Sequence, residues 1–379
     1  MQKYASILTL ASFLAIPFAG AQQGPTHEGS DTVARPRPKD SSTPADTPST
    51  QPQPKIPSKF GKKEDKMPVG PTFRSEATTV SVDVAVLDKN GNFIPGIPKE
   101  KFRILEDNVP QTVSKYEVGN EAPMTVAMVV EFSNRFQQFY TEPWYQTLMA
   151  SYGFVQTLKP EDYVAVVAYD MRSEILSDFS TNRQDTYEAL QRLRIAGFSE
   201  SNLYDAVCDT VQRMDTIEGR KAVVLISSGI DTFSKLTFDK ARKCIQEAGT
   251  AIYAIGLMQS IREIADARGY MSAMTRMDFL QADNQMKTFA KESGGQSYFP
   301  RFYGEFPGIF RSIEDALRNQ YTLSYTPSNT VRDGKFRKIK VELVDPSTGE
   351  TLRVVDEKGK PMKYTVLAKA GYTAPREVE

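Results

Sequence analysis

Four continuous apolar runs constrain the fold of this chain more than any other feature. Strands that are buried on both faces have this composition, whereas a half-buried strand alternates apolar and polar residues. Helical segments separate the runs, and strands that alternate with helices are typical of βαβ units. We therefore predict an α/β fold with a doubly wound, mostly parallel sheet. The four runs are Thr125–Val130, Tyr163–Ala168, Ala222–Ile226 and Ala251–Leu257.

Helix end signals between these runs support the same fold. Thr237 can accept a backbone N–H at the start of a helix over Phe238–Ala248, and Gly249 follows where a left-handed residue ends a helix. Gly294-Gly295 is interpreted as the turn from a helix into a strand over Gln296–Phe299. The Ile261–Met277 segment is interpreted as a helical insertion near the carboxyl ends of the strands, as either a contact surface or a cover for the sheet edge.

Amphipathic strands lie on both sides of the α/β region. Val80, Val82, Val84 and Val86 alternate with other residues, and Ile339, Val341 and Leu343 do the same later in the chain. A strand pair is expected over Phe102–Glu106 and Thr112–Val118, separated by Asp107–Pro110. We predict a small antiparallel β-sandwich, closed from both ends of the chain, with the α/β domain inserted in or beside it.

These patterns divide the chain into five parts. Residues 1–21 are expected to be a signal peptide and residues 22–71 a disordered spacer rich in Pro, Ser and Thr. Residues 72–122 would form the first half of the sandwich, residues 123–327 the α/β domain, and residues 328–375 the second half of the sandwich.

The first residues predict export. A positive start is followed by a short apolar run over Ile7–Phe18 and by the small residues Ala19-Gly20-Ala21, so Gln22 is the expected new N-terminus. We expect a periplasmic or secreted protein. No later run has the roughly 18 apolar residues that a transmembrane helix needs, so no transmembrane segment is expected after signal cleavage.

Charge and histidine content exclude several classes of function. Lys+Arg and Asp+Glu both number 47, so no overall field favours nucleic acid, and no nucleic-acid partner is expected. The single histidine, His27, lies in the expected spacer. Catalytic triads and His-ligated zinc therefore cannot form in the folded region, and we expect a protein that is not an enzyme and has no catalytic residues.

Two cysteines, Cys208 and Cys244, fall on predicted helices. In an oxidising compartment an even pair can form one disulfide, while two buried unpaired thiols are an equal alternative. Without nearby histidines they do not make a zinc site of the usual kind.

Short oxygen-bearing side chains follow the predicted buried strands. They lie in Glu131–Arg135, Ser199–Asn202 and Ser228–Thr232. Ligands of doubly wound folds bind at the carboxyl ends of the strands, so these segments form the candidate ligand-binding rim.

The chain resembles a von Willebrand factor type A domain, and in particular the VWFA-related family best known from Acidobacteria. The resemblance covers about Phe73 to Pro375. It is carried by the lead-in VSVDVAVLDKNGNFIPGIPKEKFRILEDNVPQTVSKYEV, by SNLYDAV, VVLISSGIDT and FAKESGGQSYF, and by the ending LRNQYTLSYTP…GKFRKIKVELV…AKAGY. Such domains bind other proteins through a metal-ion-dependent adhesion site, with Asp-x-Ser-x-Ser after the first strand, a Thr in the second loop and an Asp after the fourth strand.

Carried over by position, that site departs from the family pattern and is degenerate. Its places fall on Glu131, Ser133, Arg135, Ser201 and Ser228, with Asp231 three residues further on. Arg135 replaces a ligand with a fixed positive charge, which at ~5 Å would destabilise a divalent ion by several kcal/mol. We therefore expect no cofactor. If Mg²⁺ or Ca²⁺ binds nevertheless, its ligands would be Glu131, Ser133, Ser201 and Asp231. In the alternative, Arg135 pairs with Glu131 or Asp231 and takes the place of the ion.

The expected function follows from the rim. We expect an exported adhesion or interaction protein that binds a protein partner at the carboxyl edge of its α/β sheet. The alternative is a structural or scaffold component of the cell envelope that has lost the rim site.

Overall fold

The computed structural model describes residues 79–119, 123–133, 141–193, 199–355 and 359–377. The expected signal peptide and spacer fall within residues 1–78 and so lie outside the described residues. None of the helices in the described ranges has the length and apolar character that a membrane span requires.

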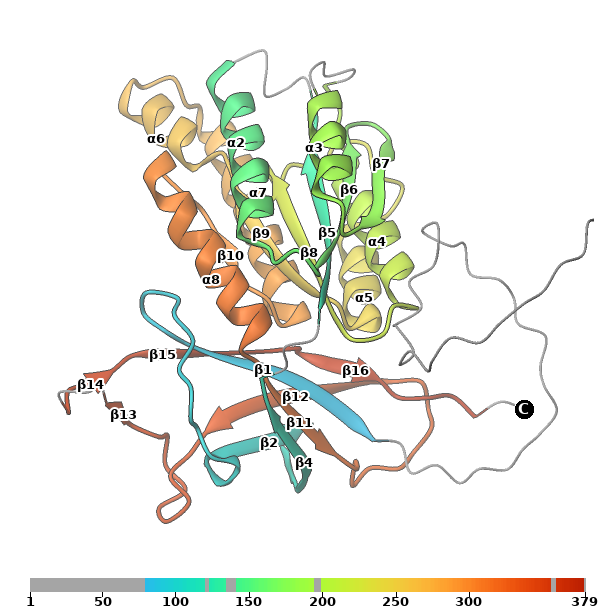
Figure 1. Ribbon diagram of the computed structural model, residues 1–379, viewed down its shortest axis with the longest axis vertical. Coiled ribbons are helices and arrows are strands. Elements are labelled where there is room, and N and C mark those ends of the chain that lie inside the picture. Colours follow the sequence, from blue (N-terminus) through green and yellow to red (C-terminus); the bar gives the residue numbers. More distant parts are fainter. Residues whose placement is uncertain (1–78, 120–122, 134–140, 194–198, 356–358, 378–379) are drawn as a thin grey trace, which may run out of the picture. The chain divides into compact units, whose positions relative to one another are not determined.

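A six-stranded sheet forms the centre of the α/β domain (Figure 1). All neighbouring strands are parallel except the last pair, which is antiparallel. The four apolar runs form the four inner strands, as predicted, and they are buried almost throughout because helices cover both faces. In spatial order the strands are β10 (Ser297–Tyr298), β9 (Ala251–Gly256), β8 (Arg220–Ser227), β5 (Met124–Glu131), β6 (Tyr163–Tyr169) and β7 (Ser173–Ser180).

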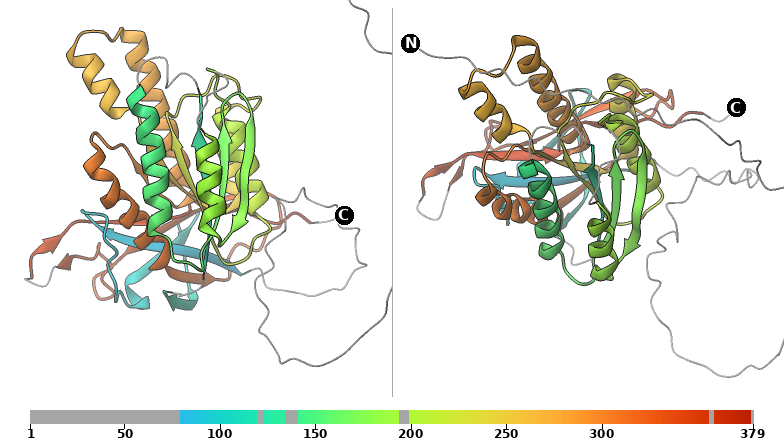
Figure 2. Two further views of the ribbon diagram at one scale, coloured as in Figure 1. Left: turned by 45° about the horizontal axis from the view of Figure 1, so that its top comes forward. Right: turned by 90° about the horizontal axis from the view of Figure 1, so that it is seen from above.

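Helices pack on both faces of this sheet, as Figures 1 and 2 show. Successive residues of β5 point to opposite faces, so Val126 and Met128 enter one core while Ala127 and Val129 enter the other. The first core includes α2 (Thr141–Thr157), α3 (Arg183–Arg192) and α8 (Phe306–Arg318). The second includes α4 (Leu203–Met214), α5 (Phe238–Ala248) and α7 (Ala273–Ser293). The predicted doubly wound, mostly parallel α/β fold is confirmed.

The end signals of α5 act as predicted. The Thr237 hydroxyl accepts the N–H of Lys240, and Gly249 ends the helix with φ 61°. The expected helical insertion over Ile261–Met277 consists of two pieces, α6 (Gln259–Ala267) and the first turns of α7. Ser272 caps α7, and Gly294 ends it with φ 89° in front of β10.

Two four-stranded antiparallel sheets pack on each other around a third core. The first has the order β15 (Tyr364–Ala368), β1 (Val80–Asp88), β11 (Tyr321–Tyr325) and β4 (Val113–Val118). The second has the order β16 (Gly371–Thr373), β12 (Phe336–Leu343), β2 (Phe102–Glu106) and β3 (Val109–Gln111). Both sheets combine strands from before and after the α/β region, as the sequence predicts. Smaller elements are η1 (Lys99–Lys101), η2 (Tyr303–Glu305), β13 (Val354–Val355) and β14 (Pro361–Met362).

Strand β1 serves two cores at once. Val80, Val82, Val84 and Val86 face the sandwich core, as their alternation predicts. The residues between them are polar at first, but Ala85 and Leu87 are buried too and belong to the core that contains α8. The second half of β1 is therefore apolar on both faces because a helix covers its outer side.

Two expectations about the sandwich were wrong. The boundary at residue 327 placed Tyr321–Tyr325 in the α/β domain, but this segment, β11, pairs with β1 and β4. The expected pairing of Phe102–Glu106 with Thr112–Val118 also fails. A two-residue turn at Asp107-Asn108, with φ 47° and 68°, pairs β2 with β3 instead, and β4 continues into the other sheet. Pro110 is tolerated in β3 because β3 is an edge strand.

Candidate binding rim

Glu131 is the last residue of β5, the strand that lies between β6 and β8. Tyr169 ends β6 and Ser227 ends β8, and parallel strands bring their carboxyl ends to the same edge of the sheet. The side chains of Glu131, Tyr169 and Ser227 therefore meet, although they are far apart in the sequence. All three are buried.

The Glu131 carboxylate is surrounded by donors. Its Oε1 accepts the Ser133 hydroxyl at 2.8 Å. Its Oε2 accepts the Ser227 hydroxyl at 2.9 Å, the Ser228 hydroxyl at 2.8 Å and the Ser228 backbone N–H at 2.7 Å. The Tyr169 hydroxyl lies 3.4 Å from the same oxygen.

Backbone groups orient the serine protons toward this carboxylate. The N–H of Gly229 donates to the Ser227 oxygen at 2.8 Å, and the N–H of Ile230 donates to the Ser228 oxygen at 3.1 Å. The Tyr169 hydroxyl also donates to Ser227, at 2.7 Å. Since each serine oxygen accepts a hydrogen bond from a backbone N–H, its own hydroxyl proton is left to donate to Glu131. Such chains of hydrogen bonds strengthen one another in a buried site.

Burial raises the pKa of Glu131, while the bonds from Ser228, Ser133 and Ser227 act in the opposite direction. Burial also raises the pKa of Tyr169, and the negative charge of Glu131 adds to that shift. The site therefore balances the cost of burying a carboxylate against several donors that favour its charged form.

Ser201 lies in the adjoining loop before α4 and is held by the segment after β8. The Ser201 carbonyl accepts the N–H groups of Thr232 and Phe233 at 2.8 and 2.9 Å, and the Ser201 N–H donates to the Thr232 hydroxyl at 2.9 Å. Asn202 is joined to the loop after β6 through the carbonyl of Asp170. The Ser201 hydroxyl and the Asn202 side-chain oxygen are buried and have no protein partner.

The Asp231 carboxylate is engaged at the start of α4. Its Oδ1 accepts the Ser234 hydroxyl at 2.5 Å and the Tyr204 N–H at 3.3 Å. The Ser234 oxygen in turn accepts the N–H groups of Tyr204 and Asp205. Asp231 and Ser234 thus satisfy N–H groups in the first turn, and Asn202, at the cap position, makes no side-chain cap bond. Burial raises the pKa of Asp231.

The predicted residues thus divide into three groups. Glu131, Ser133 and Ser228 are joined directly by hydrogen bonds. Ser201 and Asp231 belong to the neighbouring loops, which are connected through Thr232 and Tyr204. Arg135 lies outside the described residues, and so does its expected pairing with Glu131 or Asp231.

Sequence reasoning missed three residues of the rim. Tyr169 and Ser227 contact Glu131, and the available signal was their position at the ends of buried strands. Phe233 is the third, and its side chain is 53% exposed although it follows directly after rim residues. A large exposed aromatic side chain beside buried polar groups is a common anchor in protein interfaces.

Protein donors already bind the two carboxylates that a divalent cation would need as ligands. A hard cation needs several oxygen atoms with free lone pairs. Here protein protons occupy both oxygens of Glu131, and one oxygen of Asp231 accepts two donors. Across the described ranges, no group of three or more His, Cys, Asp or Glu side chains is placed to hold a metal ion.

Cys208 and Cys244 form a disulfide between α4 and α5, with a Cα–Cα distance of 5.9 Å. Of the two alternatives left open by the sequence, the structure has the bridge. It joins the two helices that follow the Ser201 loop and the Asp231 loop.

Comparisons with known proteins show a likeness among solved structures only. No family model matches the chain, and no curated protein matches it. Among solved structures, the vWF domain of the type V pili tip protein Mfa5 from Porphyromonas gingivalis has a TM-score of 0.40 and 14% identity, over 52% of this chain and 96% of that one. Proximal thread matrix protein 1 from the mussel byssus has a TM-score of 0.40 and 11% identity, over 53% of this chain.

A conserved hypothetical protein, BatB from Bacteroides thetaiotaomicron, has a TM-score of 0.37 and 12% identity over 51% of this chain and 98% of that one. For proximal thread matrix protein 1, this chain spans about half of the mussel protein's own length, 49%. The α/β fold described above rests on its own strand order and its two helix layers. Membership of the VWFA-related family stays a prediction.

Proposed function

We propose that this chain is an exported, non-enzymatic adhesion or interaction protein of the VWFA-related family. In this proposal it binds a protein partner at the rim, through a degenerate adhesion site that uses no divalent ion. The observation that carries the proposal is the hydrogen bonding of Glu131. Protein donors surround the carboxylate that would otherwise be the first ligand of a cation.

The chemistry of the rim supports binding rather than catalysis. Ser227 and Ser228 are 0% and 3% exposed, and their hydroxyl protons are directed at Glu131. A nucleophilic hydroxyl must be accessible to a substrate and must lie beside a general base that accepts its proton. Neither serine has access, and the single histidine, His27, precedes the described residues.

Binding is supported by the aromatic side chain that the rim leaves accessible. Phe233 is exposed, and it is fixed at its backbone by the carbonyl of Ser201. An exposed aromatic side chain on a fixed backbone is a common anchor at the centre of a protein interface.

Capture of partners from an extract of the cell envelope tests the proposal. The purified full chain and its Phe233→Ala variant would be compared, each in EDTA and in excess Mg²⁺. We expect the wild type to capture the same partner under both conditions and Phe233→Ala to lose at least about 90% of it, since an anchor worth about 2 kcal/mol or more weakens binding more than tenfold. Val331→Ala is a matched control, because Val331 is 59% exposed and lies between β11 and β12.

The second candidate is a structural or scaffold component that makes its contacts elsewhere. It predicts equal capture by wild type and Phe233→Ala. Capture that requires Mg²⁺ would instead overturn the ion-independent mechanism while leaving the rim as the binding surface.

A further inference from the structure

The N-terminal half of α7 is unusually exposed. Residues 273 to 278 are all exposed, and buried positions begin only at Ala282. Met274 and Met277 are 78% and 66% exposed, and Leu280 is 45% exposed. Exposed apolar residues that occur singly are normal, but several on consecutive turns of one helix indicate a contact surface.

These side chains lie on a single stripe of the helix. At 3.6 residues per turn, Met274 and Met277 share a face with Gln281, Asn284 and Thr288 further along. The stripe is apolar in the exposed half of α7. It becomes polar but uncharged in the half that packs on the domain.

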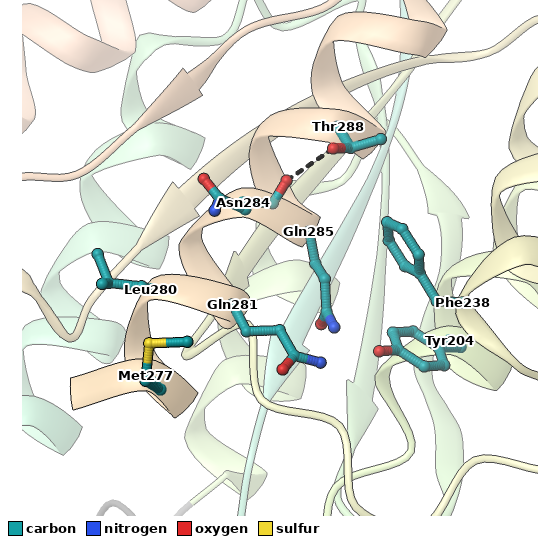
Figure 3. A pocket seen from close by; sticks show the side chains of 8 residues that line it. All are labelled: Tyr204, Phe238, Met277, Leu280, Gln281, Asn284, Gln285 and Thr288. Carbon is teal, nitrogen blue, oxygen red and sulfur yellow. Dashed lines mark hydrogen bonds between the residues drawn. The ribbon is translucent and has the colours of Figure 1, made fainter. Parts of the chain in front are cut away.

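A pocket of about 550 Å³ lies along the same stripe, and α7 lines it from Met277 to Thr288. Figure 3 shows α7 side chains, among them Gln281 and Asn284, on one side and the rings of Tyr204 and Phe238 on the other. The rings lie 6.0 Å apart and come from α4 and α5. None of the residues that line the pocket carries a charge.

The occupant of such a pocket must match it in chemistry. A charged side chain would lose its hydration there without a partner, so an apolar segment is favoured. Interfaces are depleted of charge at their centre for the same reason. Methionine is suited to aromatic walls because its flexible thioether makes favourable contacts with ring edges.

The exposed half of α7 supplies such a segment from a second copy of the chain. Met274 and Thr288 lie about two turns, roughly 10.5 Å, on either side of Gln281. A two-fold axis near Gln281 would lay two α7 helices antiparallel and bring Met274 of each copy level with Thr288 of the other. Each exposed apolar half would then enter the other copy's pocket, beside Phe238.

We infer that the chain forms a two-fold symmetric dimer through α7, in which Met274 and Met277 of each copy fill the pocket between α7, α4 and α5 of the other. This interface is isologous, so it closes at two copies and does not propagate into a filament. It goes beyond the proposed binding at the rim.

Molar mass in solution tests the dimer. Light scattering on the full chain should give twice the mass of one chain, and Met277→Glu should weaken association at least about tenfold, the effect expected for a central interface residue. Met149→Glu is the matched control, since Met149 is 47% exposed on α2, in the other helix layer. It should remain dimeric.

Cysteine trapping tests the position of the axis. The two native cysteines are joined to each other, so a cysteine introduced by Gln281→Cys is the single free thiol of the chain. It should form an intermolecular disulfide under mild oxidation, whereas Lys338→Cys, at an exposed position of β12, should not. Phe233→Ala at the rim should still dimerise.

A monomeric wild type at the highest soluble concentration overturns the inference, as does a Met277→Glu variant that stays fully dimeric. Failure of Gln281→Cys to cross-link in a dimer that Met277→Glu disrupts overturns the two-fold arrangement about Gln281.

Discussion

The carboxylate of Glu131 accepts the backbone N–H of Ser228 at 2.7 Å. Glu131 ends β5, Ser228 directly follows the end of the neighbouring parallel strand β8, and the two residues lie 97 positions apart in the sequence. Together with the hydroxyls of Ser133 and Ser227, this bond leaves the carboxylate buried and satisfied by protein donors alone.

Metal removal should leave stability unchanged. Because the donors around Glu131 already satisfy its oxygens, EDTA followed by excess Mg²⁺ or Ca²⁺ should move the melting temperature by less than about 1 °C, the result for a ligand that does not bind the native state. Differential scanning calorimetry measures this. A shift of several degrees on adding either ion would show a functional cation site and refute the expectation.

Glu131→Gln should change how stability depends on pH. Burial raises the pKa of Glu131 above its ordinary value of 4.5, so the folded chain holds this proton to a higher pH than the unfolded chain does. The free energy of unfolding of the wild type therefore falls as the pH rises from about 4.5 through the folded pKa, and glutamine removes that contribution. Urea denaturation between about pH 4 and pH 7 should show the wild type losing stability relative to Glu131→Gln as the pH increases. Two parallel curves would contradict the shift.

Asp162→Ala should destabilise the fold by about 3–5 kcal/mol, because it removes one partner of a buried ion pair. The fully buried Asp162 carboxylate accepts the N–H groups of Met124 and Lys159 and pairs with Arg318 at 2.5 Å, so it joins the starts of β5 and β6 to the last turn of α8. Chemical denaturation measures the loss. Asp239→Ala, at a side chain 87% exposed, should change stability by no more than about 0.5 kcal/mol.

Loss of the Cys208–Cys244 disulfide should lower stability by about 2–4 kcal/mol, since the bridge closes a loop across 36 positions. Thermal melts with and without a strong reductant measure this for the wild type. The double variant Cys208→Ala with Cys244→Ala should melt lower and show no response to the reductant. An unresponsive wild type would mean that the bridge contributes nothing to stability.

Apolar periodicity was sufficient to predict most of the fold. Runs such as Thr125–Val130 can be recognised as strands because both faces of the strand are buried and its residues are therefore continuously apolar. Thr237 and Gly249 mark the ends of α5 through local backbone chemistry. β7 was not predicted. As an edge strand it has no fully buried position, so its residues Ser173–Ser180 show no apolar pattern.

Pairing was harder to predict than the strands themselves. β11 resembles the buried strands in composition, yet it belongs to the sandwich, because its partners β1 and β4 come from much earlier in the chain. The turn at Asp107-Asn108 decided that β2 pairs with β3, and two residues with positive φ cannot be inferred from apolar patterning.

The sequence by itself determined that this chain has a parallel α/β region between two halves of an antiparallel sandwich. The reason is that the spacing of apolar residues within a short segment shows which faces of that strand or helix are buried. It also determined which loops lie at the carboxyl edge, and therefore placed Glu131, Ser133 and Ser228 together. Only the tertiary structure decided that Tyr169 and Ser227 complete the environment of Glu131, that Asp231 is engaged at the start of α4, and that the cysteines are bridged. The physical reason is that hydrogen bonds and disulfides depend on distances between residues that no local pattern specifies.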